Sequence, residues 1–385
     1  MYKFKDIIEE VKEFNTDLKY GLDDIVGVTI EKGLIPTIAN LTQTALDKFY
    51  IIKPGTFVYN PRTHGVRLGM GYNNTCNTYI TSWNNIAFKV KDTAHSIVTP
   101  KYLWLFFCKP IWDRLTNFLA WGSSTIVFAW KDFLDIEIDL PPIEKQREIV
   151  SEYETLTRRI RLNEQMIEKL EATAQALYRH TFVDNIDKQN LPQGWHLATL
   201  GEVCSVITKG TTPSDYSENG PVNFVKAESI SPNHYIDNKM LAHIDDNTHN
   251  IELKRSIIKE NDILFTIAGT LGKFCIADKT FLPANTNQAV AIIRVDESKI
   301  HPIDIYAMFI GGAHEDYCKR NIQQAVQANL SLETISKLPI LLLPDDMIKR
   351  FHQQIESVFC AIYLKQQENI KLTELQSLLL AKMGQ

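Results

Sequence analysis

Residues 142–183, PIEKQREIVSEYETLTRRIRLNEQMIEKLEATAQALYRHTFV, decide the fold of this chain. Apolar side chains recur there at intervals that alternate between four and three residues, which is the a/d spacing of a heptad repeat. Glycine is absent, and the single proline occupies the first turn, where its missing N–H is tolerated. The pattern predicts a helix about 60 Å long, which needs a partner to bury its apolar stripe. The predicted seam residues are Ile149, Tyr153, Leu156, Ile160, Asn163, Ile167, Leu170, Ala174 and Leu177.

The partner helix is predicted in the same chain, over residues 344–385. At a shift of 202 positions this stretch falls into the heptad frame of the first helix. Asn163 and Lys365 occupy equivalent positions in the middle of the two seams, and our hypothesis is that a buried polar residue there fixes the register of the pair. The equivalent apolar seam residues are Phe351, Ile355, Val358, Ile362, Leu372 and Leu379.

The rest of the chain is also duplicated. Residues 51–58 resemble residues 257–264 at a shift of 206, and the strand-like residues before the two long helices correspond at a shift of 202. Two copies of one mixed domain, each followed by a long helix, indicate pseudo-two-fold symmetry. We therefore predict an α+β fold in which two duplicated mixed α/β domains are joined by two long antiparallel coiled-coil helices.

Patterning and turn residues place the expected boundaries. Short strand-like runs are separated by Gly, Pro, Asn and Asp, and helical patterns follow Pro100 and Pro302. The chain lacks a βαβ alternation, so a Rossmann domain is not expected. The predicted segments are an amphipathic helix over 1–20, a first domain over 21–141, a central helix over 142–183, a second domain over 184–343 and a C-terminal helix over 344–385.

Composition limits the class of protein. The 385 residues are 44% hydrophobic, which is enough for two globular cores and extended helices. The sequence has no run of eighteen apolar residues and no signal-peptide core, so no membrane segment is expected. Six scattered cysteines without a C-x-x-C pair are typical of free thiols in a cytoplasmic protein.

Charge is distributed unevenly. The formal net charge is −5, but between Lys32 and Lys131 eleven Lys and Arg residues stand against three Asp, a local excess of +8. Such an excess is typical of a surface that contacts phosphates, although a solvated basic surface gives the same count. The second domain has no comparable excess.

Motifs for catalysis are missing. The sequence contains no P-loop, no Gly-x-Ser-x-Gly elbow, no helical histidine pair at metal spacing and no adenine-methyltransferase tetrapeptide. Glu252 and Lys254, downstream of Asp237, loosely resemble a nuclease pattern, which keeps a nuclease as a minor hypothesis. These absences favour a binding protein with no catalytic or metal site of its own.

Loops rich in Arg, Lys, Asn, Gln and Thr are the candidate contact surface for nucleic acid. Arg and Lys suit guanine edges and Asn and Gln suit adenine edges in the major groove, whereas Asn, Gly and Thr are also ordinary turn formers. The loops are 59–67, 72–74, 83–85 and 121–124 in the first domain, and 208–212, 268–273, 285–288 and 321–324 in the second. The predicted DNA-contacting residues are Asn60, Arg62, Arg67, Asn73, Asn74, Lys209, Thr211, Lys273, Asn287 and Gln288.

Four segments carry a resemblance to a known family. They are Leu140–Ile149, where the first domain meets its helix, then Leu191–Trp195, Leu200–Val203 and Lys209–Ser214. In this order, on a duplicated chain, they resemble the specificity subunits of type I restriction–modification systems over nearly the full length. The second exit, Leu343–Lys349, departs from the family pattern.

The resemblance implies two target-recognition domains, each reading one half of a split double-stranded DNA sequence, held apart by the helix pair. It implies that the helices dock two modification subunits, which hold S-adenosylmethionine and methylate adenine. Restriction and translocase subunits that use ATP and Mg²⁺ would join the complex, so this chain would bind no cofactor. The alternative from the sequence alone is a non-catalytic coiled-coil scaffold that binds protein partners.

Overall fold

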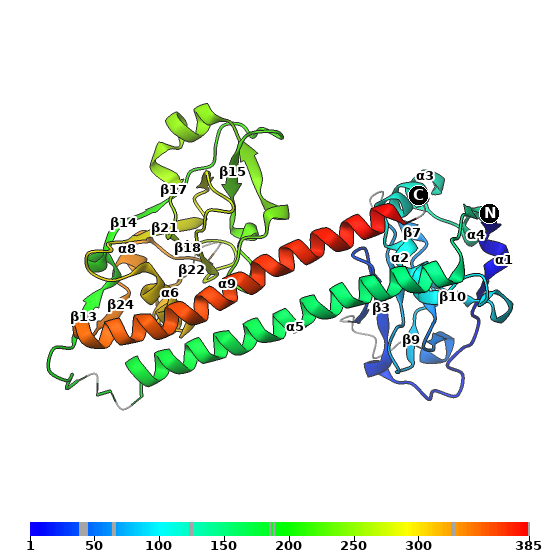
Figure 1. Ribbon diagram of the computed structural model, residues 1–385, viewed down its shortest axis with the longest axis horizontal. Coiled ribbons are helices and arrows are strands. Elements are labelled where there is room, and N and C mark those ends of the chain that lie inside the picture. Colours follow the sequence, from blue (N-terminus) through cyan, green and yellow to red (C-terminus); the bar gives the residue numbers. More distant parts are fainter. Residues whose placement is uncertain are drawn as a thin grey trace. The chain divides into compact units, whose positions relative to one another are not determined.

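The computed structural model describes residues 1–37, 45–63, 67–122, 126–184, 186–187, 189–324 and 328–383. The chain divides into two compact units (Figure 1). Unit 1 comprises Met1–Leu162 together with Glu368–Gln385, and unit 2 comprises Asn163–Gln367. Two long helices, α5 (Ile143–Phe182) and α9 (Asp345–Lys382), each begin in one unit and end in the other.

The elements of unit 1 other than the long helices lie between Tyr2 and Ile138. In chain order they are β1 (Tyr2–Lys3), α1 (Phe4–Ile7), β2 (Ile8–Glu10), β3 (Val26–Thr29), β4 (Gly33–Pro36), β5 (Tyr50–Ile52), β6 (Phe57–Tyr59), β7 (Arg62–Thr63), β8 (Met70–Tyr72), β9 (Tyr79–Thr81), β10 (Ile86–Val90), α2 (Pro100–Phe107), α3 (Pro110–Leu119), β11 (Ile126–Val127), α4 (Trp130–Asp135) and β12 (Glu137–Ile138).

The elements of unit 2 repeat this style between His196 and Leu342. They are β13 (His196–Thr199), β14 (Cys204–Lys209), β15 (Val222–Val225), β16 (Ala242–Ile244), β17 (Ile257–Ile258), β18 (Ile263–Thr266), β19 (Phe274–Ile276), β20 (Ala284–Thr286), β21 (Val290–Val295), α6 (Pro302–Ile310), α7 (Glu315–Asn321), β22 (Gln323–Gln324), β23 (Ala328–Asn329), α8 (Leu332–Ser336) and β24 (Pro339–Leu342).

The two units share two of their sheets, and unit 2 has a further four-stranded sheet of order β16-β15-β20-β17. Unit 1 has a four-stranded sheet of order β2-β10-β6-β8 and a two-stranded sheet β1-β12. Unit 2 has the same arrangement, in the order β14-β21-β18-β19, with β13-β24 as its two-stranded sheet. In both sheets the strand that comes first in sequence lies beside the one that comes last. The predicted α+β fold of two duplicated domains with two long packed helices is therefore confirmed.

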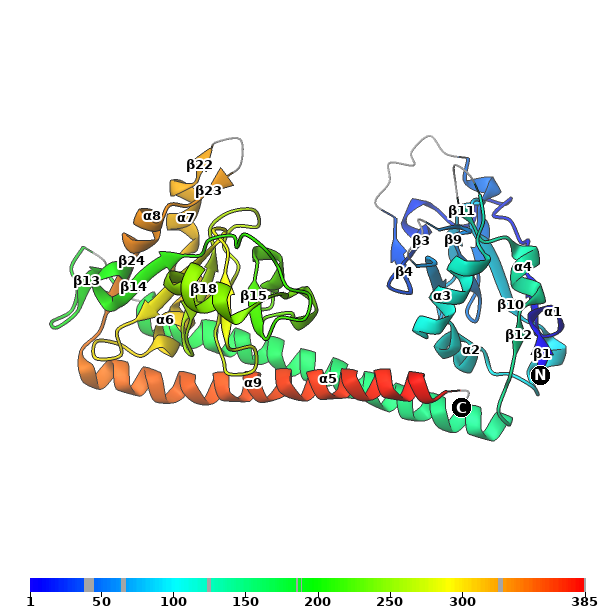
Figure 2. The same ribbon diagram turned by 90° about the horizontal axis from the view of Figure 1, so that it is seen from above.

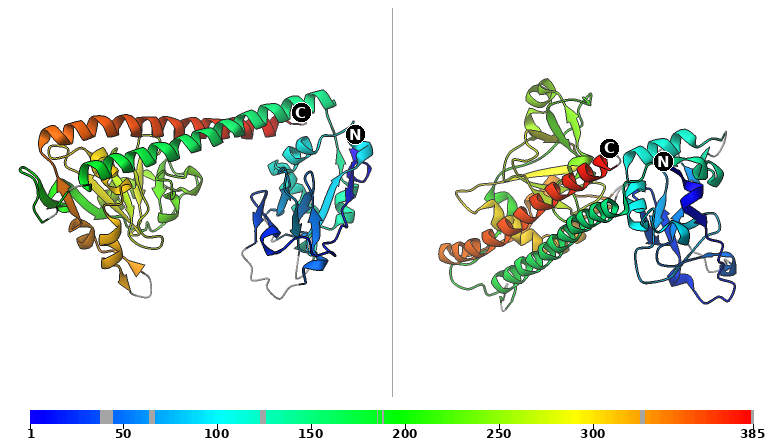
Figure 3. Two further views of the ribbon diagram at one scale, coloured as in Figure 1. Left: turned by 90° about the horizontal axis from the view of Figure 1, so that it is seen from below. Right: turned by 45° about the vertical axis from the view of Figure 1, so that its right-hand side comes forward.

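The long helices lie side by side and antiparallel within each unit (Figure 3). In unit 1 the Nε atom of Arg159 donates to Oε1 of Glu368 at 2.6 Å, and Nε2 of Gln376 donates to Oγ1 of Thr157 at 2.7 Å. In unit 2 the ring centroids of Phe182 and Phe351 are 4.9 Å apart. Residue numbers rise along one helix as they fall along the other, as antiparallel pairing requires.

Seam residues are most buried where the long helices pack against the globular part of each unit, which we call its head. Ile149 and Tyr153 pack into the core cluster of unit 1, whereas Leu156 and Ile160 are only half-buried. Asn163 is 1% exposed, in agreement with a mid-seam position, and its role in setting the register stays a prediction. In unit 2 the seam residues Phe351, Ile355 and Ile362 are buried in the core cluster, and Leu170 and Val358 pack against it.

In each unit, side-chain hydrogen bonds connect the head to the long helix that follows it. In unit 1 the side chain of Gln146, on the first turn of α5, is completely buried. Its Oε1 accepts from the Thr99 backbone N–H at 3.0 Å, and its Nε2 donates to the carbonyls of Ile97 at 2.8 Å and Pro141 at 2.9 Å. One side chain thereby satisfies three backbone groups, two just before α2 and one just before α5, that would otherwise lack partners.

Unit 2 uses an acidic side chain for the same junction. Asp304 on α6 is 2% exposed, and its Oδ1 lies 3.1 Å from Nδ1 of His352 on α9. Burial raises the pKa of the Asp304 carboxyl to about 6, partly offset by the His352 hydrogen bond.

The predicted amphipathic helix over 1–20 is wrong. The helix is confined to α1, and the chain continues as β2, which pairs with β10. Beyond β2 the backbone N–H groups of Val11 and Asn15 donate to the carbonyls of Ala87 and Phe49. Sheet partners far away in sequence thus satisfy the backbone of these residues, and a four-residue helix has little stability of its own.

We expect Gln146→Ala to lower the free energy of unfolding by about 3 kcal/mol, because it leaves three backbone groups at the α2–α5 junction unsatisfied. Thermal or denaturant unfolding of the purified chain measures this loss. Gln165→Ala, at an exposed position of α5, is the matched control and should change stability by less than about 0.5 kcal/mol. Equal effects of the two substitutions would contradict the anchoring role of Gln146.

Candidate nucleic-acid interface

In unit 1, three of the predicted contact residues gather at one end of the sheet. Tyr59 pairs with Met70, so Asn60, Arg62 and Arg67 all lie in the connection between β6 and β8. Oδ1 of Asn60 accepts from the Arg62 backbone N–H at 3.0 Å and so shapes the turn that leads into β7. The Arg62 and Arg67 side chains are exposed and form no ion pair with the described residues.

A buried ion pair holds the return of this connection. Nζ of Lys32 lies 2.5 Å from Oδ1 of Asp113 on α3 and donates to the Leu68 carbonyl at 2.7 Å. The same carboxylate oxygen accepts from the Leu68 N–H at 3.3 Å. The backbone next to Arg67 is therefore fixed to α3 while the arginine side chain extends into solvent.

Asn73 and Asn74 lie at the opposite end of the same strands, because Tyr72 pairs with Phe57. Asn74 is exposed, whereas Asn73 is completely buried. The Asn73 amide nitrogen donates to the carbonyls of Ile52 and Asn77, and its oxygen accepts from the N–H and hydroxyl of Thr75. With every polar group of its side chain bonded internally, Asn73 is a turn-forming residue, which corrects its predicted role as a DNA contact.

In unit 2 the predicted residues gather at the equivalent end of the sheet. Lys209 pairs with Ala291 and Thr266 pairs with Val290, so the end of β14 and the β18–β19 connection lie at the same end of the sheet, which we call the sheet edge. The Lys273 N–H donates to Oγ1 of Thr266 at 2.9 Å. The exposed or half-exposed predicted residues at this edge are Lys209, Thr211, Lys273, Asn287 and Gln288.

Two loops at this edge are held in contact. The Thr211 N–H donates to the Thr286 carbonyl at 3.2 Å, and Oγ1 of Thr212 donates to Oε1 of Gln288 at 2.5 Å. A Cβ at Gly210 would lie 1.6 Å from the Thr286 carbonyl oxygen, so only glycine permits this approach. The edge thus presents Lys209, Thr211 and Gln288 from two segments as one polar surface.

The basic excess of the first domain is partly neutralised by carboxylates from outside the counted range. Lys53 pairs with Glu13 at 2.7 Å, and Lys101 pairs with Glu154 at 2.6 Å. Lys89 pairs with Glu9 at 3.2 Å. The count of +8 therefore overstates the positive charge available for phosphates. Arg62 and Arg67, which are exposed, are the stronger candidates for phosphate contacts in unit 1.

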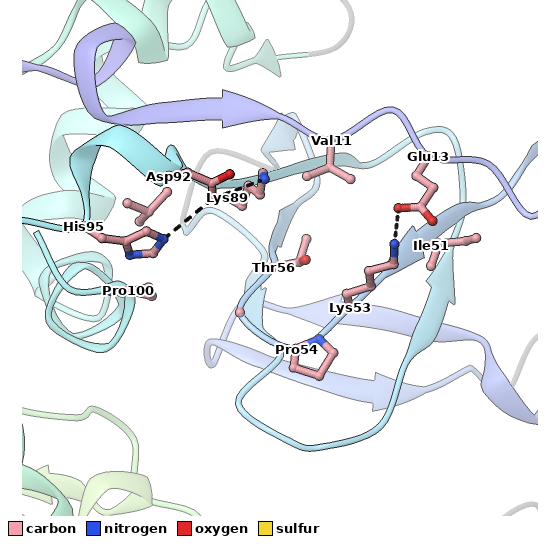
Figure 4. Close-up of a pocket in the computed structure, with 12 residues that line it drawn as sticks. Val11, Glu13, Ile51, Lys53, Pro54, Thr56, Lys89, Asp92, His95 and Pro100 are labelled. Carbon is pink, nitrogen blue, oxygen red and sulfur yellow. Dashed lines mark hydrogen bonds and ion pairs between the residues drawn. The ribbon is translucent and has the colours of Figure 1, made fainter.

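A pocket of about 370 Å³ in unit 1 does not suit a phosphate. Figure 4 shows Lys53 directed at Glu13, and His95 beside Asp92. The cations that line the pocket face carboxylates from neighbouring segments. The pocket also adjoins the Lys53–Thr56 turn, near the end of the hairpin opposite Arg62.

The minor nuclease hypothesis gains no support. Oε1 of Glu252 accepts from the N–H and the hydroxyl of Ser214, both at 2.9 Å, which is a structural capping role. The described side chains include no group of three His, Cys, Asp or Glu residues able to hold a metal ion.

The six cysteines are free thiols, as predicted. Among the described helices, none has a segment apolar and long enough to cross a bilayer.

Sequence reasoning missed one cation at the unit 2 edge. Nη2 of Arg255 donates to Oγ1 of Thr211 at 3.3 Å, which adds a guanidinium to the surface formed by Lys209 and Gln288. The two residues are 44 positions apart, and no sequence pattern links them. Of the predicted loops, residues 64–66 and 123–124 lie outside the described part of the chain.

The sequence of the chain matches that of a known protein family. The family described as type I restriction modification DNA specificity domain matches the chain twice, over residues 2–172 and 192–374. The chain belongs to this family. It is a DNA specificity subunit of a type I restriction–modification system, the non-catalytic member of such a complex.

Named relatives of this specificity subunit are distant in sequence. It is 20% identical to the type I restriction enzyme MjaIX specificity subunit of Methanocaldococcus jannaschii, over 74% of this chain and 68% of that protein. It is 21% identical to the HindI specificity subunit of Haemophilus influenzae, over 86% of each chain.

The fold of the specificity subunit is shared with a solved structure. The crystal structure of the S subunit of a type I system from M. genitalium matches with a TM-score of 0.54, covering 98% of this chain and 94% of that one at 14% identity. At this identity the match supports the fold of two β-rich domains with two long packed helices.

We expect Arg62→Ala to weaken binding of the complex to its DNA site about tenfold and to reduce the slope of log K against log salt by roughly one, without changing stability. Asn73→Ala is the matched comparison, because it should lower the free energy of unfolding by about 2 kcal/mol and leave the affinity of the folded complex unchanged. Salt titrations of binding and thermal unfolding measure both effects. The reverse assignment of effects would contradict the correction made for Asn73.

Proposed function

We propose that this specificity subunit reads a bipartite site in duplex DNA. Each unit would contact one half-sequence through the loops at one end of the four-stranded sheet that the two units share. The observation that carries the proposal is the repeated strand order, with exposed polar and cationic side chains at the same edge in both units. The β6–β8 connection holds Arg62 and Arg67, and the equivalent β18–β19 connection holds Lys273. Two similar frameworks with different edge residues suit two different half-sequences.

The side chains at these edges have the chemistry that base and phosphate contacts require. A guanidinium forms paired hydrogen bonds with the guanine edge, and an amide such as that of Gln288 matches adenine. Lysine ammonium groups such as those of Lys209 and Lys273 neutralise phosphates, which positions the subunit on the duplex without specifying sequence.

We propose that α5 and α9 dock two modification subunits. In unit 1 a groove of about 510 Å³ between the helices is lined by Leu156, Leu375, Leu378 and Leu379. Leu375 and Leu378 are 50% and 57% exposed, which leaves a leucine-rich strip uncovered on a surface helix. An uncovered strip of this kind suits an apolar helix of a partner.

The reaction is proposed to take place in the partners. Modification subunits would hold S-adenosylmethionine and methylate adenine, and restriction and translocase subunits would use ATP and Mg²⁺, all in the cytoplasm. A flipped adenine would leave this subunit the task of gripping the flanking bases and backbone. The alternative from the sequence, a coiled-coil scaffold that binds protein partners, predicts DNA affinity that is weak and independent of salt, whereas phosphate contacts require affinity to fall steeply as salt rises.

Shortening both long helices by one heptad, residues 157–163 of α5 and 368–374 of α9, should change the interval between the half-sequences and keeps the leucines that line the groove. Seven residues of helix correspond to about 10 Å, or roughly three base pairs. Sequencing of methylated DNA from cells that carry the shortened subunit gives the new motif.

Both half-sequences should persist in the shortened variant, because neither sheet edge is altered. An interval that stays the same would refute the spacer role of the helices. A variant shortened in α5 alone is the control, because it displaces the two seams relative to each other and should lower the stability of the subunit.

Leu378→Asp should abolish or strongly weaken the complex with modification subunits while leaving the subunit folded, because the side chain is mostly exposed and a carboxylate is costly in an apolar interface. Size-exclusion chromatography with light scattering measures the assembly. Leu18→Asp is the control, since Leu18 is 60% exposed in a loop of unit 1 far in sequence from the groove. Unchanged assembly of the Leu378 variant would exclude the groove as the docking site.

A further inference from the structure

Large apolar side chains on α3 and just beyond its end are exposed on unit 1. Phe118 is 84% exposed and Trp121 is 73% exposed. Ile111 is 48% exposed, and the exposed Arg114 completes the same face at helical spacing. An exposed aromatic face of this kind marks an interaction site rather than ordinary surface.

Trp121 is fixed beside Arg62 by backbone pairing. Its N–H donates to the Val127 carbonyl at 3.1 Å, and the Val127 N–H donates back to the Trp121 carbonyl at 3.0 Å. Val127 also pairs with Arg62 through β7 and β11. Directly paired residues of antiparallel strands project to the same face, so the indole and the guanidinium flank Val127 on one side of a small ribbon.

Unit 2 contains the same ribbon with different residues. Asn329 of β23 pairs with Gln323 and bridges to Ala268, as Val127 pairs with Trp121 and Arg62 in unit 1. At the shift of 202, Trp121 corresponds to Gln323 and Phe118 corresponds to Arg320. Figure 2 shows that in each unit the ribbon lies at the end of the head away from the long helices.

This difference between the units indicates whether DNA or a partner protein binds the exposed residues near Trp121. Two different half-sequences need different chemistry at equivalent positions of a duplicated framework. The exposed Phe118 in unit 1 and the exposed Arg320 at the equivalent position of unit 2 therefore favour DNA. The neighbouring Arg62 and Arg114, which form no ion pair with the described residues, also suit a polyanion.

We propose that Trp121 is a specificity-determining residue that places apolar surface against a base step of the half-sequence read by unit 1. Apolar side chains act in this way by stacking on or wedging between bases, so the base step that deforms most readily is preferred. The inference rests on the proposed function of unit 1. It adds a contribution from the shape of the DNA to the recognition by unit 1.

Trp121→Ala and Trp121→Phe in the complex with modification subunits test the proposal. Binding to the duplex that carries the methylated motif should weaken about tenfold or more for the alanine variant and much less for phenylalanine. The slope of log K against log salt should stay as in the wild type, because no phosphate contact is removed. Methylation of a DNA pool with randomised bases should relax in one half-sequence only.

Tyr2→Ala, at another exposed aromatic residue of unit 1, is the matched control and should leave both affinity and motif unchanged. An unaltered motif and affinity for Trp121→Ala would overturn the proposal, as would loss of the modification subunits from the complex, which would mark a protein-docking face. A wild-type complex without any sequence preference would instead refute the proposed function itself.

Discussion

The apolar stripes of α5 and α9 are the constraint on which the rest of the structure depends. A single helix of 40 residues exposes its stripe along its whole length, so α5 cannot be stable without α9. Antiparallel pairing covers that stripe near the heads, where Ile149 and Phe351 enter the two cores. Between them, half-buried residues such as Leu156 leave apolar surface that neither helix covers. One pattern therefore provides both the framework of the subunit and the exposed leucines that we propose as a docking surface.

Duplication allows one framework to serve two purposes. The strand order and the small ribbon at the sheet edge are the same in both units, because hydrophobic packing and backbone pairing decide them. The exposed side chains at equivalent positions differ, as Phe118 and Arg320 illustrate. Core residues are thus limited by packing, whereas the exposed residues that we propose to contact DNA are not.

The sequence predicted those parts of the fold whose cause is local. Heptad spacing is visible in the residues themselves, and α5 begins one residue from the predicted start of 142. The helix expected over 1–20 failed because Val11 and Asn15 are bonded to Ala87 and Phe49, partners that no local pattern reveals. Asn73 was misassigned for the same reason, since its burial depends on Ile52 and the fold of the whole turn. The edge residues Arg62, Lys209 and Gln288 were found by composition, but only the pairing of distant strands brings each set together.

The composition of unit 1 has a consequence for biosynthesis. Its compact body includes Glu368–Gln385, and Met383 is 2% exposed within its core cluster. Lys109 also donates to the carbonyl of Met383. A nascent polypeptide leaving the ribosome can therefore complete unit 2 before unit 1, although unit 1 is synthesised first. Premature termination of translation would leave the first head without part of its interior, so an incomplete product would be exposed to proteolysis before it could compete for partners.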